Sequence, residues 1–476
     1  MTDLNQKQDA ELHRPVYHYT PNTGWMNDPN GLVYHDGTYH LFYQAGENDR
    51  RWDHATSTDL RTWSHHGTKI PATDDIEAFS GGAVVDERNT AGFGNDAIVC
   101  MYTGNHDSPG EQDQRFAYST DGGETVQKYD GNPVLSDGHD EWRDPNPFWY
   151  EPTENWRMVV SRVEQRDTDR PAGIEIYESE NLLDWEYLDT YESGTESWEC
   201  PDLCRLPVEN ANEDRWVMTV AVEWDHTEYH IGHFDGETFI AERAVRADAG
   251  HDFYAAQSWS NQPGEDRRTS IAWMNHWGYA RDLSDEGWKG SATLPRELGL
   301  RDTDRGIVPV QRPHDGLTAE RTGTRVSRDD VALDATTDPL AAVATDDLTV
   351  YELVADVDPG DANRVMFKLR ADETRDDETR LVYRPAKREL MFDRTDAGQF
   401  FGKTGYEVTS HPLRSRTDGT VKLRVFVDKN VVTSVANDGE AMMTNQIYPR
   451  PTSTDTRVTV DGGTATLDRL RLYEYV

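Results

Sequence analysis

A loose internal repeat of strand-and-turn units constrains the fold of this chain more than any other sequence feature. Ser57–Trp63 (STDLRTW) resembles Ser179–Trp185 (SENLLDW), and a related turn, Tyr118–Gly122, lies between them. Phe234–Gly236 continues the series, which gives a spacing of roughly 60 residues. Each unit combines a short strand, a polar Gly/Asn/Asp turn and a second strand that carries an aromatic residue. Repeated over residues 25–310, this pattern predicts an all-β architecture with little helix.

The repeat leaves two ways of building such a domain open. Units of roughly 60 residues can hold four strands each, so about five of them would form the blades of a closed β-propeller with short, protected edges. A β-sandwich whose turns recur by coincidence is the alternative. The repeat ends in a Pro-rich, polar stretch at residues 302–317. We place a domain boundary there, between residues 21–312 and residues 318–476, and we expect residues 1–20 to form an N-terminal extension.

The sequence after this boundary has longer alternating runs of apolar and polar residues. Asn437-Asp438-Gly439 is a strong hairpin signal, because these residue types accept positive φ. Four runs are predicted as strands: Leu348–Val357, Arg364–Arg370, Arg380–Asp393 and Val421–Val427. The pattern predicts a C-terminal β-sandwich.

The charge of the chain is strongly negative and narrows its possible partners. It has 88 acidic against 48 basic residues, a net charge of −40, and only nine of the basic residues are lysines. No basic footprint for nucleic acid is present, and 14 Trp, 21 Tyr and 13 Phe argue against a disordered acidic chain. An acidic excess with few lysines is typical of proteins adapted to molar salt, where the Debye length falls to about 3 Å. We therefore predict a folded protein from a halophile.

Three further features bear on the compartment and the partners of the protein. Met1–His13 is polar and charged without an apolar signal region, so we expect a cytoplasmic protein. No run approaches the ~20 apolar residues of a membrane span, and no membrane partner is expected. Cys100, Cys200 and Cys204 do not form a disulfide framework and have no matching ligands at zinc-site spacing. We expect reduced thiols, no metal and no other cofactor. Assembly into a homo-oligomer is a possibility that the sequence leaves open.

Three acidic residues stand in distinctive settings, in the motifs Trp25–Gly31 (WMNDPNG), Arg143–Pro147 (RDPNP) and Trp198–Leu203 (WECPDL). The Pro and Gly that follow Asp28 are turn residues, so we expect a turn that opens a hairpin. Two prolines around Asp144 predict a stiff, extended backbone, and the adjacent Arg143 favours the ionised carboxylate. Glu199 lies between an aromatic residue and a thiol, an apolar neighbourhood that suits a general acid.

Any one of these acids alone would be read as a surface or turn residue in so acidic a chain. All three motifs, however, resemble the signatures of glycoside hydrolase family 32, the invertase, inulinase and levanase family of β-fructosidases, in the family's order. Further segments resemble the family: His40–Gln44, Trp52–Leu60, Phe79–Gly82 (with Gly82 departing from the family's Ser), Asp252–Gln257, Leu294–Leu298 and Leu423–Gly439. The resemblance covers about residues 15–476 and implies a five-bladed β-propeller catalytic domain followed by a β-sandwich.

The resemblance also implies a retaining mechanism and assigns a role to each acid. Asp28 would be the nucleophile, Glu199 the acid/base, and Asp144 would hold the fructosyl hydroxyls and stabilise the transition state. A nucleophile needs a low pKa, which we expect the neighbouring amide and backbone donors to give Asp28. Cys200 is predicted to tune the acidity of the site. The predicted activity is that of an exo-β-fructofuranosidase, which releases fructose from sucrose or short fructo-oligosaccharides through a covalent fructosyl-Asp28 intermediate.

A small sugar substrate needs amides and hydroxyls for its hydroxyl groups and aromatic faces for its C–H surface. The residues predicted to supply them are Trp25, Asn27, Gln44, Trp52, Phe79, Ser80, Arg143, Tyr254 and Trp277. For Trp52, Phe79 and Trp277, packing in the core is the alternative interpretation.

Three other functions stay open on the sequence. A fructosyltransferase would pass the same intermediate to a sugar, and an inulin or levan exo-hydrolase would act on polymers. Glu228 stands where some relatives carry a basic residue that affects sucrose preference, which argues against strict sucrose specificity. A non-catalytic fructan-binding module is disfavoured, because a binding module has no need of all three acids.

The acidic composition generates a prediction about salt. We expect the protein to unfold less cooperatively and to be less active in tens of millimolar salt than in molar KCl, because the repulsion among its carboxylates is then less screened. Urea unfolding followed by tryptophan fluorescence, at both salt concentrations, measures this. Identical unfolding curves and activity at the two concentrations would show that the protein is not adapted to salt.

Overall fold

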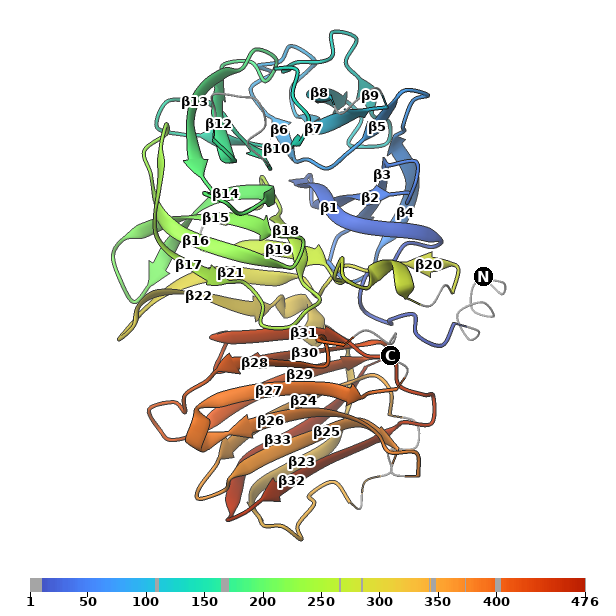
Figure 1. The fold of residues 1–476 in the computed structure, drawn as a ribbon, viewed down its shortest axis with the longest axis vertical. Helices are drawn as coiled ribbons and strands as arrows, with labels where there is room; N and C mark the ends of the chain where they lie inside the picture. Colours follow the sequence, from blue (N-terminus) through green and yellow to red (C-terminus); the bar gives the residue numbers. More distant parts are fainter. Residues whose placement is uncertain are drawn as a thin grey trace.

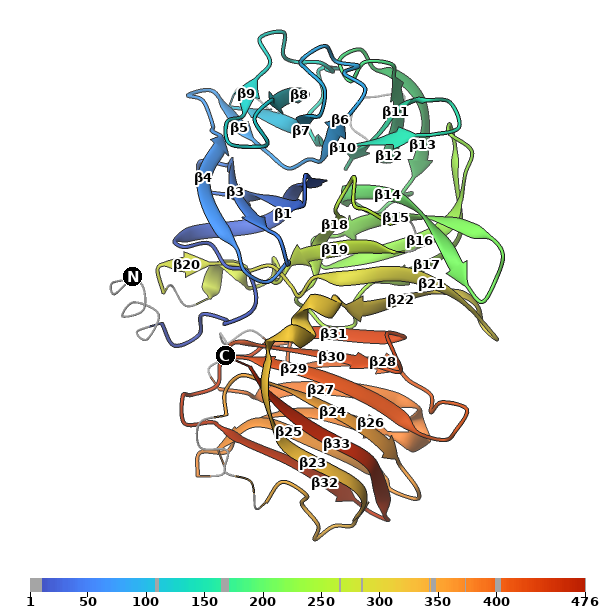
Figure 2. The same cartoon turned by 180° about the vertical axis from the view of Figure 1, so that it is seen from behind.

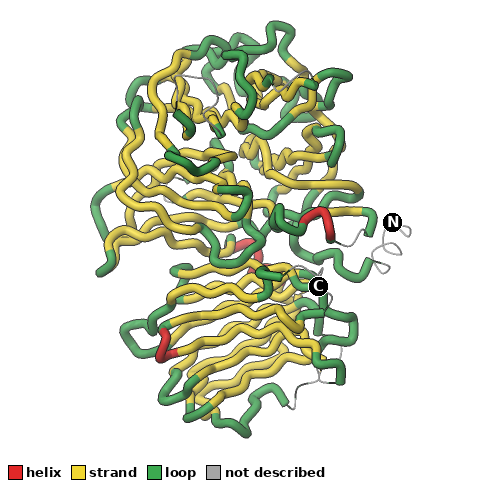
Figure 3. The backbone as a smooth tube through the Cα atoms, viewed as in Figure 1, coloured by secondary structure: helices red, strands yellow, loops and turns green. Residues whose placement is uncertain are grey.

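The computed structural model describes residues 11–107, 111–163, 171–264, 267–283, 286–341, 343, 348–372, 374–398 and 404–475. In this part of the chain, helix is limited to three short 3-10 helices, η1 (Ala280–Asp282), η2 (Asp315–Glu320) and η3 (Pro385–Lys387). Strands dominate the backbone (Figure 3). The expected all-β class is confirmed, while residues 1–10 of the predicted N-terminal extension lie outside the described residues.

The first part of the chain forms antiparallel units that follow one another along the sequence (Figure 1). The described strands are β1–β4 (Gly24–His35, Thr38–Ala45, Arg51–Ser57, Ser64–Ile70), β5–β9 (Ile76–Ala78, Ala83–Asp86, Ala97–His106, Gln112–Ser119, Gln127–Lys128), β10–β13 (Trp142–Tyr150, Asn155–Arg162, Gly173–Ser179, Glu186–Glu192), β14–β17 (Trp198–Glu209, Asp214–Val222, His226–Phe234, Phe239–Arg246), and β18, β19, β21 and β22 (Tyr254–Ser258, Arg268–Trp273, Arg296–Thr303, Gly306–Pro313). A short parallel pairing of β14 with β21 merges the last two units into one sheet, and β20 (Trp288–Lys289) pairs with β1.

Hydrogen bonds link each unit to the next and the last unit back to the first. The donors and acceptors are Gly31 N to Gly81 O (2.9 Å), Gly82 N to Pro145 O (2.8 Å), Asn146 Nδ2 to Pro201 O (3.1 Å), Ser258 N to Asp202 Oδ2 (2.9 Å) and Ser260 N to Leu32 O (3.0 Å). The approach is so close at Gly82 that a Cβ there would lie 2.3 Å from Asn146 Oδ1 of the next unit. The units therefore form a closed ring around a shared centre.

The motif Trp25–Gly31 does not form the turn that its Pro and Gly predict. It lies inside β1, which is distorted by register shifts between Met26 and Pro29 and between Asn30 and Val33. The hairpin turn comes later, at Asp36 and Gly37, whose φ values are 45° and 81°. The turn residues of the motif serve to bend a strand rather than to end one.

The second part of the chain is a two-sheet sandwich. One sheet has the order β23-β33-β24-β29-β30-β31 and the other the order β28-β27-β26-β25-β32. The strands are β23 (Arg321–Leu333), β24 (Tyr351–Asp358), β25 (Arg364–Asp372), β26 (Asp377–Arg384), β27 (Glu389–Asp396), β28 (Val408–Pro412), β29 (Val421–Asp428), β30 (Val431–Ala436), β31 (Ala441–Gln446), β32 (Asp455–Asp461) and β33 (Ala465–Tyr475). Both sheets contribute to one buried core, for example Leu353 and Val425 from the first and Phe367 and Leu381 from the second.

Two sequence predictions for the sandwich have different outcomes. The turn at Asn437-Asp438-Gly439 is confirmed, since it connects β30 with β31 and both Asn437 and Asp438 have positive φ. The single long strand predicted over Arg380–Asp393 is wrong. It is two strands, β26 and β27, because Pro385 opens η3 and Arg388 turns the chain with φ of 52°.

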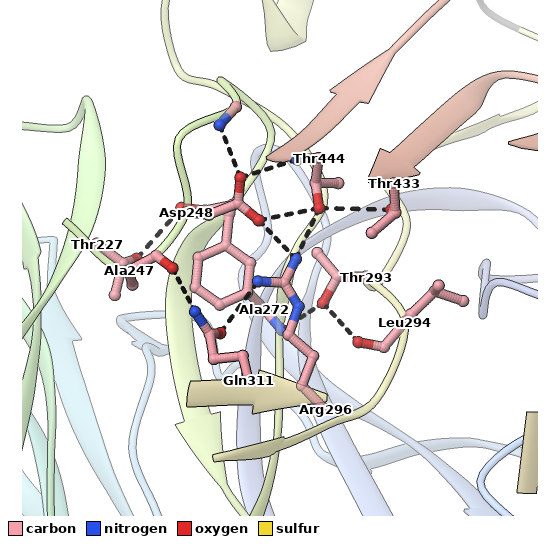
Figure 4. A network of polar contacts seen from close by, with 12 residues as sticks. Thr227, Ala247, Asp248, Ala272, Thr293, Leu294, Arg296, Gln311, Thr433 and Thr444 are labelled. Atoms are coloured by element: carbon pink, nitrogen blue, oxygen red, sulfur yellow. Dashed lines mark hydrogen bonds and ion pairs between the residues drawn. The ribbon is translucent and has the colours of Figure 1, made fainter. Parts of the chain in front are cut away.

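A buried ion pair of the ring forms hydrogen bonds with Thr444 of the sandwich, and β31 lies beside β22 (Figures 1 and 2). Arg296 of β21 donates to Asp248 Oδ2 (2.7 Å) and to Thr444 Oγ1 of β31 (2.6 Å), and its guanidinium lies 4.0 Å from the centre of the Phe253 ring (Figure 4). The Thr444 backbone N–H donates to Asp248 Oδ1 at 2.8 Å. One carboxylate thus satisfies donors from both parts of the chain.

The N-terminal segment is also held to the sandwich by a buried carboxylate. Asp428 accepts hydrogen bonds from the backbone N–H groups of Val16 and Tyr17, and His18 Nδ1 lies 2.9 Å from Asp428 Oδ2. The segment that leads into β1 is therefore fixed at its start.

The Asp248–Arg296 pair generates a stability prediction. Arg296→Met leaves the buried Asp248 carboxylate without its charged partner, so we expect a loss of about 3–5 kcal/mol in the free energy of unfolding. The matched control is Arg205→Met, which removes an exposed partner of Asp214 (side chains 61% and 37% exposed) and should cost less than about 1 kcal/mol. Urea unfolding in molar KCl measures both, and equal losses would contradict the prediction.

Candidate active site

Four strands of the ring carry the same one-residue bulge beside the predicted site residues. In each case three steps along one strand oppose two steps along its partner: Met26 to Pro29 against Ala45 to Tyr43, Arg143 to Asn146 against Ser161 to Val159, Glu199 to Asp202 against Ala221 to Thr219, and Tyr254 to Gln257 against Trp273 to Ile271. The bulges in β10, β14 and β18 place Asp144, Cys200 and Ala255 at φ of 64°, 50° and 52°. A bulge bends its strand and re-aims side chains, so four strands direct side chains to one place.

Asp28 lies in the bulge of β1 with its two oxygens in different states. Ser80 Oγ donates to Oδ2 at 2.7 Å, whereas Oδ1 is buried and has no hydrogen-bond partner among the described residues. Burial raises the pKa of Asp28 above its usual range, the charge of Glu199 adds to the rise, and the Ser80 hydroxyl opposes it. The low pKa expected for Asp28 is therefore wrong for the free site, because burial outweighs the hydrogen-bond donors.

Both oxygens of Glu199 are held by side chains from neighbouring units. Arg143 donates to Oε1 from Nε (3.0 Å) and from Nη2 (2.8 Å), and Tyr254 Oη donates to Oε2 at 2.6 Å. Burial and the nearby carboxylates raise the pKa of Tyr254 well above 10, so its hydroxyl keeps the proton that it donates. Arg143, predicted as a neighbour of Asp144, is thus bound through its side chain to Glu199.

Asp144 is 2% exposed and contacts backbone and hydroxyl groups. The Cys200 backbone N–H donates to Asp144 Oδ2 at 2.9 Å, and the Asp144 N–H donates to Thr103 Oγ1 at 3.0 Å. Burial raises the pKa of Asp144 despite the opposing charge of Arg143, and the charges of Glu199 and Asp28 raise it further. Arg143 does favour the ionised form, as predicted, because its charge lowers this pKa, but burial raises the pKa by more.

Cys200 contributes to the site through its backbone. Burial, with the charge of Asp144, raises the pKa of its thiol well above 9, so the sulfur stays protonated. Cys100, Cys200 and Cys204 are all buried and free of disulfides. Its predicted effect on the acidity of the site stays a prediction.

Amide side chains surround Asp28 and connect it to the ring. Asn27 Oδ1 accepts from Trp25 Nε1 (2.7 Å) and from Arg50 Nη1 (3.3 Å). Gln44 Nε2 donates to the Ala78 carbonyl at 2.8 Å, and its Oε1 lies 3.2 Å from Ser80 Oγ. The hydroxyl and amides predicted as sugar contacts are brought together here with their orientations fixed.

The predicted aromatic contacts divide into a wall of the site and the core. Trp25 stacks on the half-buried Trp277, with ring centres 6.2 Å apart and planes at 26°, and Phe79 lies beneath the Arg50 guanidinium. Trp52 is fully buried (0% exposed) and donates from Nε1 to the Phe79 carbonyl at 2.8 Å. The structure therefore places Trp52 in the core, from which it holds Phe79.

Sequence reasoning missed four polar residues that contact the predicted ones. Arg50 contacts Asn27, Thr103 accepts from Asp144, and Gln112 Oε1 (3.4 Å) and Glu141 Oε2 (2.5 Å) accept from Arg143 Nη1. Only Gln112 had a signal, because it opens a strand that begins with the polar run Gln-Asp-Gln and is buried there. The other three lie outside recognisable motifs.

The described residues also bear on metal binding and on membrane insertion. Neither the ring nor the sandwich, as far as they are described, contains a group of three or more His, Cys, Asp or Glu side chains that could hold a metal ion. Within the same residues, no helix is long and apolar enough to cross a membrane.

Comparisons with known proteins match nearly all of the chain. Residues 18–313 match the model of the glycosyl hydrolases family 32 N-terminal domain, and residues 317–474 match that of the family 32 C-terminal domain. Levanase of Bacillus subtilis is 38% identical (92% of this chain, 67% of the relative), and extracellular exo-inulinase of Aspergillus awamori is 32% identical (97% and 94%).

Solved structures agree with the sequence comparisons. The crystal structure of exo-inulinase from Aspergillus awamori has a TM-score of 0.90 at 30% identity and covers 98% of this chain and 99% of its own. The β-fructofuranosidase of Schwanniomyces occidentalis, solved with fructosyl-erythritol, has a TM-score of 0.87 at 27% identity and covers 98% of both chains.

Proposed function

The chain belongs to glycosyl hydrolase family 32, and we propose that this glycoside hydrolase is a retaining exo-β-fructofuranosidase. The observation that carries the proposal is the convergence of Asp28, Asp144 and Glu199 from three bulged strands, with one oxygen of Asp28 buried and free of hydrogen bonds. A pair of carboxyl groups, one for attack and one for proton transfer, is what this reaction class requires.

Asp28 is the nucleophile in this proposal. Its Oδ1 accepts no hydrogen bond from the described residues, while Ser80 donates to Oδ2 and so fixes the plane of the carboxylate. Attack of Oδ1 on the anomeric carbon of a terminal fructosyl group forms a fructosyl ester and breaks the bond to the leaving oxygen.

Glu199 is the general acid and then the general base. It gives a proton to the leaving oxygen in the first step and takes one from the attacking water in the second. Arg143 and Tyr254 hold its two oxygens, so the carboxyl group keeps one orientation through both steps.

Asp144 binds the fructosyl hydroxyls in this proposal. It is buried beside Cys200 N–H and has a raised pKa, which falls when hydroxyl donors or a developing positive charge come near. Asn27 and Gln44 add amide groups, and Trp25 with Trp277 gives an aromatic wall for the C–H surface of the sugar.

We also propose that the closed ring is the five-bladed β-propeller that the resemblance implies. Its support is the set of hydrogen bonds that joins each unit to the next, from Gly31 to Gly81 and onward to Ser260 and Leu32. The site lies where the bulged strands of these units meet.

The substrates proposed are sucrose and short fructo-oligosaccharides, with exo-hydrolysis of inulin or levan as a second candidate. The relatives favour the second candidate, since one is named a levanase and another an exo-inulinase. The relative solved with fructosyl-erythritol supports recognition of a terminal fructosyl group.

Product analysis tests the function. We expect equal release of glucose and fructose from sucrose in molar KCl, because water is the proposed acceptor. Glucose well ahead of fructose would show transfer to sugar, and fructose from inulin or levan without release from sucrose would establish the second candidate. Oligosaccharide products from the polymers would contradict exo-action, and no release from any of the three would overturn the proposal.

Two substitutions test the catalytic roles in the same assay. Asp28→Ala and Glu199→Ala should each lower kcat by several orders of magnitude while the protein stays folded. Near wild-type turnover in either variant would refute its role. Peptide mass spectrometry after an acid quench should find the fructosyl ester on the peptide that carries Asp28.

The raised pKa of Asp28 predicts the acid limb of the pH profile. The nucleophile acts ionised, so kcat/KM falls as the pH drops through this pKa. Ser80→Ala removes a hydrogen bond that lowers the pKa, so the acid limb should move to higher pH. Ser57→Ala, which removes a similar bond to the remote Asp59, is the control and should leave the limb in place. Equal profiles for all three proteins would contradict the assignment.

A further inference from the structure

A tyrosine of the sandwich packs beneath the segment that carries Trp277. Tyr406 precedes β28, yet its ring lies 4.9 Å from the ring of His276, 5.1 Å from that of Tyr279 and 5.3 Å from that of His251. A Cβ at Gly278 would lie 2.1 Å from Tyr406 Oη. The tyrosine thus occupies the space that a side chain at Gly278 would need.

A second sandwich residue, Arg394 of β27, holds the same segment from below. Its Nε donates to the Tyr406 carbonyl (2.8 Å), its Nη2 to Tyr279 Oη (3.1 Å) and its Nη1 to Asp252 Oδ2 (2.9 Å). Arg394 and Asp252 are both buried, at 1% and 0% side-chain exposure. The guanidinium therefore fixes the position of Tyr406 relative to the ring of units.

His276 connects the segment that carries Trp277 to the turn between β15 and β16. The Gly278 N–H donates to His276 Nδ1 (2.8 Å), which leaves Nε2 to donate to Asp225 Oδ1 at 3.1 Å. Asp225 belongs to the turn between β15 and β16, in which Glu223 and Trp224 have φ of 52° and 54° and Trp224 is 40% exposed. This turn follows the β15 residues that pair with Trp198 and Glu199.

We propose that the sandwich shapes the entrance of the active site, with Tyr406 as a positioning residue for Trp277 and, through His276, for the turn that carries Trp224. The inference rests on the proposed function, in which Trp277 contacts the sugar. The described contacts of Tyr406 are with the segment that carries Trp277, with His251 and with Arg394, and not with the reacting carboxylates. Its loss should therefore weaken substrate binding and leave the chemical step intact.

The first experiment compares Tyr406→Ala with Tyr406→Phe in the full chain. We expect Tyr406→Ala to raise KM several-fold while kcat stays within about twofold, because only binding contacts are displaced. Tyr406→Phe keeps the ring contacts with His276 and Tyr279 and should restore most of the affinity. A wild-type KM in Tyr406→Ala would overturn the proposal. A several-fold fall of kcat with KM unchanged would also overturn it.

A matched control separates positioning from general loss of stability. Tyr383 is a buried tyrosine of β26 in the same sandwich, and its hydroxyl contacts Ser415. Tyr383→Ala should lower the melting temperature and leave KM unchanged. A KM shift in Tyr383→Ala as large as that in Tyr406→Ala would show a structural effect only and would refute the positioning role.

Two further measurements test the packing of Tyr406. The first needs no substrate, and the second tests the contact between Tyr406 and Gly278. Amide hydrogen exchange of residues 275–282 should be faster in Tyr406→Ala than in wild type, even if the chain were inactive on every fructoside, and unchanged exchange would overturn the proposal. Gly278→Ala forces its new methyl against Tyr406 Oη and should raise KM in the wild-type background, but much less in Tyr406→Ala. Additive effects of the two substitutions would contradict the contact.

Discussion

The active site depends on one backbone device, the one-residue bulge, which recurs in β1, β10, β14 and β18. An undistorted strand sends successive side chains to opposite faces, so neighbours such as Arg143 and Asp144 could not both serve one site. The bulges place Asp144 and Cys200 in left-handed conformations that cost energy for residues other than glycine. The hydrogen bonds that close the ring, such as the one from Gly82 N to Pro145 O, hold the strands in place and so keep these residues in their strained conformations.

Bringing three carboxyl groups into one buried place has an electrostatic consequence. Burial and mutual repulsion raise the pKa of both Asp28 and Asp144, although each accepts hydrogen bonds. The buried cation Arg143 faces Glu141, Asp144 and Glu199, so its charge is divided among them. Both carboxyl groups therefore hold a proton more readily than exposed ones do, and hydrogen-bond donors of a bound sugar favour the ionised forms.

The sequence predicts what short contiguous patterns determine and fails where distant residues decide. The all-β class follows from the repeat, and the three acids stand out because each signature is local. The bend at Asp28 resembles a turn, because Pro and Gly serve both turns and bulges. The bond from Arg143 to Glu199 spans 56 residues and leaves no local pattern. The sequence predicts Trp52 as a sugar contact with core packing as the alternative, and its full burial in the structure favours the core. The break at Pro385 was readable from the proline itself, since proline interrupts a strand.

Two buried carboxylates that bond to the sandwich, Asp248 and Asp252, lie in a segment that leads into the site. Asp248 accepts hydrogen bonds from Arg296 and from Thr444, and Asp252 accepts one from Arg394. Both aspartates lie in the segment that leads to Tyr254, which donates to Glu199. The same carboxylate of Asp252 accepts from Tyr279, just beyond Trp277. The sandwich therefore holds the two segments that supply the acid's partner and the aromatic wall. A carboxylate bonded to both parts transmits the position of one to the other, which gives the second domain a place in binding as well as in stability.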